Sequence, residues 1–463
     1  MSNEFLPTGW VLAKYADVYL SASNGTGGKQ NKDGMGIPVS RIETISEEDI
    51  DYQRIGYLAE FDQLKVSKHL LVEGDILFSH INSPIHLGKT AVYDGKQTLY
   101  HGINLLRIVV DRKLILPRFL NYHCKYIRAL GEFSLNAQHA VNQSSLNQRK
   151  LGEFELHLPP LTEQKAITDQ LGTLLSQVET TKSRLERTLE TLKQFRQSVL
   201  SAAVSGKLTE VWRDTTELHS WQVVKLGAIV EAIEAGKNLK CIETPPKENE
   251  FGIIKISAVT WGTYDEEQSK TLPLDELFIE SRRIKVGDLL ISRANTIELL
   301  GNPVIVHEVT KNLMLSDKVL RMVMKENDKP WVSIFLRSAD GRREIESRST
   351  GNQMSMRNIG QKALLDIDLP KAPDEEQTEI IHRVEKLFAW ADSIEKQVNE
   401  AQQRVNNLTQ SILAKAFRGE LTEQWRKDNP DLISGENSAE SLLKKIKAER
   451  ELAKPEKRGR KKS

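Results

Sequence analysis

One phrase occurs twice in this chain of 463 residues, and the repeat constrains the fold more than any other feature. AVSGKLTEVWR ends at Arg213, and AFRGELTEQWR ends at Arg426. The similarity extends back to Glu163 and Glu376 at the same offset of 213, and 14 of these 51 aligned positions are identical without a gap. GDILFSHIN (74–82) and GDLLISRAN (287–295) repeat the offset. A period above 200 residues is too long for a solenoid, so the sequence predicts a tandem duplication of one whole module.

The conserved part of each module is predicted to be a long helix. Apolar or small residues recur at alternating spacings of three and four over four heptads, which is typical of a coiled-coil seam. We expect helices of about 40 residues, or ~60 Å, with Thr162 and Asp374 as N-caps and Gly206 and Gly419 as C-terminal stops. Two matched seams favour pairing with each other over separate packing, and the sequence leaves the direction open. The seam residues are Leu171, Leu174, Val178, Leu185, Leu192, Phe195, Val199, Val384, Leu387, Ile394, Val398, Val405, Leu408 and Ile412.

The variable part of each module is predicted to be an α/β domain. Strand-like runs such as GDILFSH, LLRIVV, FGIIKISAV and NPVIVHEV are separated by Gly, Asn and Pro turns. The expected fold class is therefore α/β plus long helices, with two α/β domains and pseudo-two-fold symmetry. The expected domains are 1–157 and 214–368 (α/β), 158–213 and 369–426 (conserved helical regions), and 427–463 (a short helix and a basic tail).

Charge and cysteine content limit the class of protein. The net charge is +1, but residues 453–463 alone carry six Lys or Arg and one Glu, so the rest of the chain carries +1 − 5 = −4. We therefore do not expect the folded body to bind DNA by bulk positive charge; the tail could contact phosphates or simply aid solubility. Cys124 and Cys241 are far apart, which fits a reducing cytosol and excludes a CxxC metal site. No apolar run reaches the ~20 residues that cross a bilayer.

The sequence lacks the motifs of common catalytic sites. SPIHLGKT (83–90) ends like a phosphate-binding loop, but Ser83 replaces the first glycine and a strand-like run follows. The same place in the second module reads TIELLGNP, with no lysine. We find no GxSxG, no HExxH, no glycine-rich adenosylmethionine loop and no amino-methylation signature. These absences weigh against an enzyme.

The chain resembles the specificity (S) subunit of type I restriction–modification enzymes, type IA branch. The resemblance covers nearly the whole length and is strongest in NNLTQSILAKAFRGELTEQWRKDNPDLISGENSAESLLKKIKAER (406–450). LPPLTEQKAI (158–167) and FRQSVLSAAVSGKLTEVWR (195–213) resemble the branch's central conserved region. The variable regions carry no equally specific motif, as expected where relatives diverge to recognise different DNA.

The resemblance implies a non-catalytic subunit of a larger cytoplasmic complex. Each variable region would be a target recognition domain for one half of a bipartite, asymmetric target in double-stranded DNA. The conserved helices, an antiparallel coiled coil in the family, would hold these domains apart and set the unread spacer. They would dock two modification (M) subunits, which methylate adenine at N6 with S-adenosylmethionine. Two restriction (R) subunits, which use ATP and Mg²⁺, would join this complex. No cofactor, metal or membrane contact is expected for this chain.

Two sets of candidate site residues follow. Base edges are contacted by Arg, Lys, Asn, Gln and His side chains from loops and helices. The candidates for DNA contact are Lys29, Gln30, Asn31, Lys32, His80, Asn82, His86, Lys89, Gln138, Asn142 and Gln143 in the first domain and Arg293, Asn295, Asn352, Gln353 and Arg357 in the second. The candidates for partner docking are Gly206, Leu208, Trp212, Gly419, Leu421 and Trp425. Arg107 and Arg321 recur beside apolar strands and are predicted to make structural ion pairs instead.

Two other classes remain open at this point. A coiled-coil scaffold with two ligand-binding α/β domains would bind no specific DNA sequence. A solitary two-domain enzyme would repeat its catalytic residues at the offset of 213, and the sequence repeats none.

Overall fold

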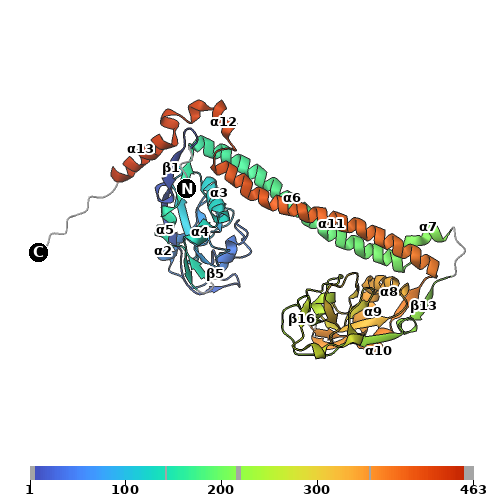
Figure 1. The fold of residues 1–463 in the computed structure, drawn as a ribbon. Helices are drawn as coiled ribbons and strands as arrows, with labels where there is room; N and C mark the ends of the chain where they lie inside the picture. Colours follow the sequence, from blue (N-terminus) through green and yellow to red (C-terminus); the bar gives the residue numbers. More distant parts are fainter. Residues whose placement is uncertain (1–5, 141–142, 215–219, 354–355, 453–463) are drawn as a thin grey trace. The chain divides into compact units, whose positions relative to one another are not determined.

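The computed structural model describes residues 6–140, 143–214, 220–353 and 356–452. The chain divides into two compact units, one made of residues 1–184 and 401–463 and the other of residues 185–400. Each unit holds one α/β domain and a stretch of each of two long helices (Figure 1). Within the described ranges, no helix is long and apolar enough to span a membrane.

The first α/β domain is built on a four-stranded antiparallel sheet of order β2-β9-β6-β8. Its strands are β2 (Tyr19–Asn24), β6 (Ile76–Phe78), β8 (Thr90–Val92) and β9 (Leu106–Val110), and the main helix of the domain is α3 (Pro117–Ala129). Three smaller sheets accompany it: β1 (Val11–Lys14) with β12 (Glu155–Leu158); β3 (Gln30–Asn31), β5 (Gly56–Leu58) and β4 (Ile37–Val39); and β10 (Gln138–Ala140), β11 (Gln143–Ser145) and β7 (Ile81–Asn82).

The second α/β domain repeats this plan in its central sheet and in two of its three smaller sheets, although its sequence differs. A four-stranded sheet of order β14-β21-β17-β19 corresponds to β2-β9-β6-β8. Its strands are β14 (Ala232–Ala235), β17 (Leu289–Ser292), β19 (Pro303–Ile305) and β21 (Val319–Val323), with α8 (Asp328–Arg337) as a main helix. The smaller sheets are β13 (Gln222–Lys225) with β24 (Asp368–Lys371); β16 (Ser269–Thr271), β15 (Phe251–Ile254) and β20 (Asn312–Met314); and β18 (Ala294–Asn295), β23 (Met356–Asn358) and β22 (Thr350–Gln353).

Matched ion pairs brace the two central sheets. Arg107 on β9 contacts Asp75 at 2.6 Å, and Arg321 on β21 contacts Asp288 at 2.9 Å. Both aspartates follow a glycine in the repeated Gly-Asp phrase that precedes β6 and β17. The structure thus confirms the prediction that these arginines make structural ion pairs.

The two long helices are α6 (Leu161–Val204) and α11 (Asp374–Phe417), each of 44 residues, and they pack against each other (Figure 1). Each begins directly after a proline, Pro160 or Pro373, because the proline ring disfavours helical backbone angles at the residue before it. The predictions that Thr162 and Asp374 are N-caps are wrong, because α6 begins at Leu161 and α11 begins at Asp374 itself. The Thr162 hydroxyl donates to the Leu432 carbonyl at 3.1 Å.

The pairing is antiparallel within each unit. In the first unit, Leu413 and Phe417 near the end of α11 share a core with Ile167 and Leu171 near the start of α6. In the second unit, the end of α6 packs against the start of α11, and Arg196 contacts Asp392 at 2.6 Å and Glu395 at 2.7 Å. The structure therefore supplies the direction that the heptads left open.

Most residues of the predicted seam lose much of their surface to this pairing. Leu171, Val178, Leu192 and Val199 of α6 are buried, as are Val384, Val398 and Val405 of α11. Leu174, Leu185, Phe195, Leu387, Ile394 and Ile412 are half-buried. Leu408 keeps 47 % of its surface exposed, and Leu413 is buried one turn further along.

The chain returns to the first domain after α11. Helices α12 (Glu423–Asp428) and α13 (Ala439–Leu452) follow, and Leu443 and Ile446 of α13 join the core of the first unit. Arg450 contacts Asp111 at 2.7 Å. The basic tail at 453–463 lies outside the described residues.

Candidate nucleic-acid interface

A small sheet in the first domain gathers several predicted DNA contacts. In the order β10-β11-β7, Ser144 lies opposite Asn82, and Gln138 lies opposite Ser145. The backbone of Gln143 pairs with Ala140 on the same sheet. Candidates that are more than 50 positions apart in sequence thus share one β-ribbon, whereas Asn142 lies outside the described residues.

The second domain places its candidates on the corresponding sheet. Asn295 on β18 lies opposite Arg357 on β23, which in turn pairs with β22. The backbones of Asn352 and Gln353 form the end of β22. Arg293 directly precedes β18 and is exposed. The two domains therefore place these candidates on three-stranded sheets of equivalent strand order. Two strands of such a sheet form a β-ribbon, which is one of the shapes that enter a major groove.

Some candidates are committed to contacts within the protein. Arg357 donates to the Ser349 hydroxyl at 2.8 Å and to the Ser349 carbonyl at 3.0 Å. Lys89 donates to the Ser46 carbonyl. Asn295 donates to the Thr260 hydroxyl at 3.2 Å. A side chain that is already bonded in this way is less free to meet a base edge.

His80 is the most enclosed of the candidates. Its Nε2 lies 3.1 Å from Nδ2 of Asn24, and its buried Nδ1 has no hydrogen-bond partner among the described residues. Burial lowers the pKa of His80 to about 4, so the imidazole is neutral at pH 7. A neutral, buried imidazole offers no positive charge to DNA.

Other candidates remain open to solvent. Lys29, Lys32, His86 and Gln138 are exposed. Gln30 and Asn31 form β3, and the Asn31 amide donates to the Met35 carbonyl at 3.0 Å. An exposed side chain that the sequence analysis did not single out is Trp261, with 74 % of its surface accessible, next to the Thr260 that accepts from Asn295. A lone tryptophan offers no spacing pattern, so only its exposure distinguishes it.

A buried carboxylate joins the two repeats in the first unit. The side chain of Glu163, near the start of α6, has no exposed surface. It accepts from Trp10 Nε1 at 2.8 Å, from the Thr422 hydroxyl at 2.7 Å and from Arg426 at 2.6 Å. Arg426 also donates to the Gly419 carbonyl at 2.6 Å, so it holds the turn after α11 together. We call these four side chains the first lock.

The second unit has the same arrangement, but here the second repeat supplies the carboxylate and the tryptophan, and the first repeat supplies the threonine and the arginine. The side chain of Glu376, near the start of α11, is also fully buried. It accepts from Trp221 Nε1 at 2.8 Å, from the Thr209 hydroxyl at 2.7 Å and from Arg213 at 2.7 Å. Burial raises the pKa of Glu376, but hydrogen bonds from Arg213, Thr209 and Trp221 outweigh it and hold the pKa below its usual range. We call these four side chains the second lock.

The predicted docking residues surround the locks. Gly206 and Gly419 adopt left-handed backbone angles (φ 73° and 78°) that favour glycine. A Cβ on Gly419 would lie 2.5 Å from Cγ of Pro7. Leu208 and Leu421 pack against the cores of their units, and Trp212 and Trp425 are half-buried. Val211 in the same phrase is 79 % exposed and was missed, because a single valine outside a heptad gives no signal.

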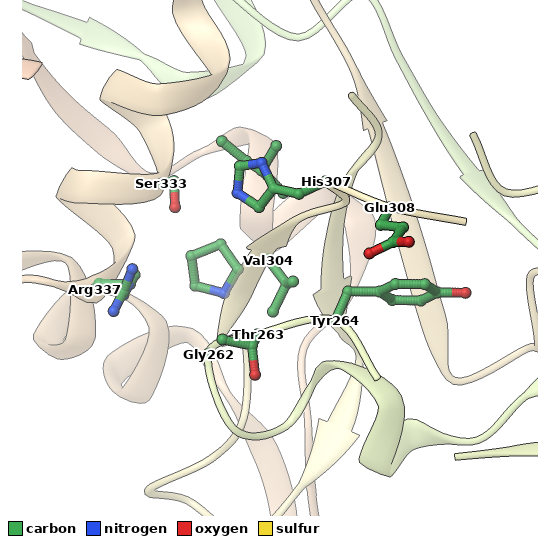
Figure 2. Close-up of a pocket in the computed structure, with 10 residues that line it drawn as sticks. Gly262, Thr263, Tyr264, Val304, His307, Glu308, Ser333 and Arg337 are labelled. Carbon is green, nitrogen blue, oxygen red and sulfur yellow. The ribbon is translucent and has the colours of Figure 1, made fainter. Parts of the chain in front are cut away.

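Each unit also contains a cavity. A cavity of 330 Å³ in the second domain has Arg337 on one side and Glu308 and Tyr264 on the other (Figure 2). A cleft of 1930 Å³ in the first unit lies between α3 and the helix pair and is lined by Lys125, Arg128 and Lys182 together with acidic neighbours. Within the described residues, no group of three or more His, Cys, Asp or Glu side chains is placed to hold a metal ion.

Comparison with known proteins decides the family. The family model for the type I restriction modification DNA specificity domain matches residues 7–191. The chain is 37 % identical to the type I restriction enzyme EcoKI specificity subunit of Escherichia coli strain K12, and 32 % identical to the StySPI specificity subunit of Salmonella potsdam. Both alignments cover 100 % of each chain. The chain belongs to the type I restriction enzyme specificity subunits.

Solved structures show the same fold for this specificity subunit. It matches a chain from work on complex assembly and conformational transition of the type I R-M system with a TM-score of 0.63 at 17 % identity, covering 90 % of this chain and 100 % of that one. It matches the HsdS subunit from Thermoanaerobacter tengcongensis with a TM-score of 0.52 at 16 % identity, covering 90 % and 99 %. The predicted fold of two α/β regions with paired long helices is confirmed.

Membership also establishes the general role of the chain. It is the DNA specificity subunit of a type I restriction–modification system and is itself non-catalytic. In this family the cofactors belong to the modification and restriction subunits. The cavity beside Arg337 therefore needs no catalytic interpretation.

Proposed function

We propose that this specificity subunit recognises a bipartite, asymmetric DNA target, with each α/β domain reading one half. The observation that carries the proposal is that two domains with the same strand order in the central sheet, but different sequences, each place candidate DNA contacts on an equivalent three-stranded sheet. Two domains with similar backbone folds but different side chains can dock on the same kind of duplex and recognise two different half-sites. Phosphate contacts position a protein on DNA, and base-edge contacts select the sequence.

The five-part division expected from the sequence remains part of this proposal. Residues 1–157 and 214–368 are assigned to target recognition, 158–213 and 369–426 to the helical frame, and 427–463 to the terminal helix and basic tail. The antiparallel packing of α6 and α11 in each unit supports the role of the helix pair as the spacer between the two half-sites.

We further propose that the complex contains two M subunits and two R subunits, working in the cytoplasm. Two locks of the same composition support a pair of equivalent docking places, one near each. The M subunits would use S-adenosylmethionine to methylate adenine at N6, and the R subunits would use ATP and Mg²⁺. Residues 1–452 carry a net charge of −4, which supports the view that the partner subunits supply most of the contacts to DNA phosphates.

The test is to co-express the chain with its modification partners in a host lacking other adenine methyltransferases, and to map methyladenines across the genome. We expect one motif with two specified halves, a fixed unread spacer and one methylated adenine in each half. A continuous motif without a spacer would overturn the bipartite assignment. The absence of any sequence-specific methylation would favour a scaffold that binds no DNA.

A further inference from the structure

Each recognition domain meets the helix pair through a carboxylate of its own repeat that is held by side chains of the other repeat. In the first lock, Trp10 and Glu163 come from the first repeat, and Thr422 and Arg426 come from the second. The second lock reverses these roles. This exchange follows from the antiparallel helices, because the end of each helix lies beside the start of the other.

The first lock joins three parts of its unit at one carboxylate. Trp10 directly precedes β1, which pairs with β12, and β12 leads into α6. Thr422 and Arg426 lie on the segment after α11. Apolar packing is non-directional, whereas three hydrogen bonds to one charged group fix both distance and direction. The carboxylate therefore defines the angle at which the recognition domain leaves the helix pair.

We propose that Glu163 and Glu376 are positioning residues that set these two angles and thereby restrict the spacer lengths that the complex accepts. The inference rests on the proposed bipartite recognition. One added base pair moves the far half-site by 3.4 Å and rotates it by about 35°, given 10–10.5 base pairs per turn. If the junction between each domain and the helix pair is stiff, the second domain cannot reach the displaced half-site. If the junction is loosened, the domain can rotate to reach it.

Glutamine is the most informative replacement because it keeps the shape of the side chain. In Glu163→Gln, the oxygens that accept from Trp10, Thr422 and Arg426 become one oxygen and one NH₂ group. The NH₂ group cannot accept, so at least one of the donors loses its partner. Trp10→Phe and Thr422→Val each remove one donor, while the carboxylate and Arg426 remain in place. Trp221→Phe and Glu376→Gln are the counterparts in the second lock.

The experiment uses the complex of full-length chain and M subunits. Each variant is supplied with a DNA library in which both half-sites are intact and the spacer varies by one or two base pairs. We expect methylation of spacers one base pair too long or too short to rise about tenfold relative to the preferred spacer, a change equivalent to ~1.4 kcal/mol. The bases required in each half-site should not change. Glu440→Gln is the matched control, because Glu440 is exposed and pairs only with Lys444 among the described contacts.

The possible outcomes separate the inference from the proposed function. If the wild-type complex shows no bipartite motif, the proposed function is wrong, and the inference that depends on it is wrong as well. If the wild type prefers one spacer and the assembled variants keep an equally sharp preference, the inference alone is wrong. If Glu163→Gln does not assemble, Trp10→Phe and Thr422→Val decide by the same assay, and an unchanged preference in both overturns the inference. Relaxed base requirements within a half-site would also count against it.

Discussion

Arg426 donates to the buried carboxylate of Glu163 at 2.6 Å although the two residues are 263 positions apart. Arg213 makes the matching bond to Glu376 at 2.7 Å. The side chain of Arg426 is 12 % exposed, and that of Arg213 is 34 % exposed. The two locks therefore share their chemistry but differ in their access to solvent.

Because of this difference in exposure, we expect removal of the two arginines to lower the free energy of unfolding by unequal amounts. Arg426→Met leaves Glu163 buried without its cation, and breaking a buried pair in this way costs roughly 3 kcal/mol. We expect a smaller loss for Arg213→Met, because water can reach that pair. Urea unfolding of the full chain measures both. Equal losses of stability in the two variants would mean that solvent exposure does not govern the strength of the ion pairs. The double variant Glu163→Met with Arg426→Met should recover part of the lost stability, because no unpaired charge is then left buried.

Acid should destabilise the first recognition domain through its buried histidines. Burial lowers the pKa of His80 and His101 to about 4 and that of His123 to about 3, against about 6.5 when unfolded. Because the folded pKa values are the lower ones, protons favour the unfolded state, and stability falls between about pH 6.5 and pH 4. His101→Gln should weaken this dependence, whereas exposed His86→Gln should not. Urea midpoints at pH 7 and pH 5 provide the measurement.

Loss of the charge on Glu376 should add a second step at lower pH. Its folded pKa lies below the unfolded value, so its contribution is complete above about pH 5 and is lost as the pH falls through the folded pKa. Glu376→Gln should be less stable than wild type at pH 7, and the two should converge in acid. A constant difference between them from pH 7 to pH 3 would contradict this assignment.

Partner docking is better tested at Val211 than at the leucines predicted from sequence. Leu208 packs against the core of its unit, so Leu208→Asp should lower the stability of the chain itself. Val211 is 79 % exposed, and Val211→Asp should leave thermal unfolding unchanged while reducing recovery of an M subunit in a pull-down. Leu64→Asp, at an exposed position of the first recognition domain, is the control. Full recovery with Val211→Asp would exclude this surface from docking.

Recognition residues should act on one half-site each. Arg293 is exposed beside β18, and Arg293→Ala should relax one or two base positions in a single half-site of the methylation map, with a loss of about 1–3 kcal/mol at those positions. Gln138→Ala should affect only the other half-site. If either substitution weakens methylation equally at all sequences, the side chain contacts the backbone of DNA rather than a base.

Spacer length should follow helix length. Seven residues added to each of α6 and α11 near Glu186 and Asn399 keep the heptads in register and lengthen the pair by ~10 Å. The preferred spacer should grow by about three base pairs at 3.4 Å each. Affinity should nevertheless fall, because three base pairs also rotate the far half-site by about 100°. An unchanged spacer in an active complex would show that the helices do not measure it.

The sequence predicted the duplication, the two long helices and the structural role of Arg107 and Arg321, because each leaves a periodic or repeated signal. It also marked Glu163 and Glu376 as matched positions without assigning them a role. Val211 and Trp261 went unnoticed, since exposure depends on what the rest of the fold covers. The N-cap at Thr162 was misplaced because α6 begins directly after Pro160, two residues earlier than an N-cap at Thr162 implies.

The sequence by itself determined the family, the repeated frame and the heptads that bury one face of each helix, since these depend on residue type and spacing along the chain. Residue spacing left the direction of the helices open, and only the family resemblance implied it. The tertiary structure decided that direction and which repeat supplies the arginine for each buried carboxylate. A heptad pattern buries the same side chains in parallel and antiparallel pairs. The hydrogen bonds that distinguish the two join Glu163 and Glu376 to residues of the other repeat that lie more than 160 positions away, and no local pattern encodes that distance.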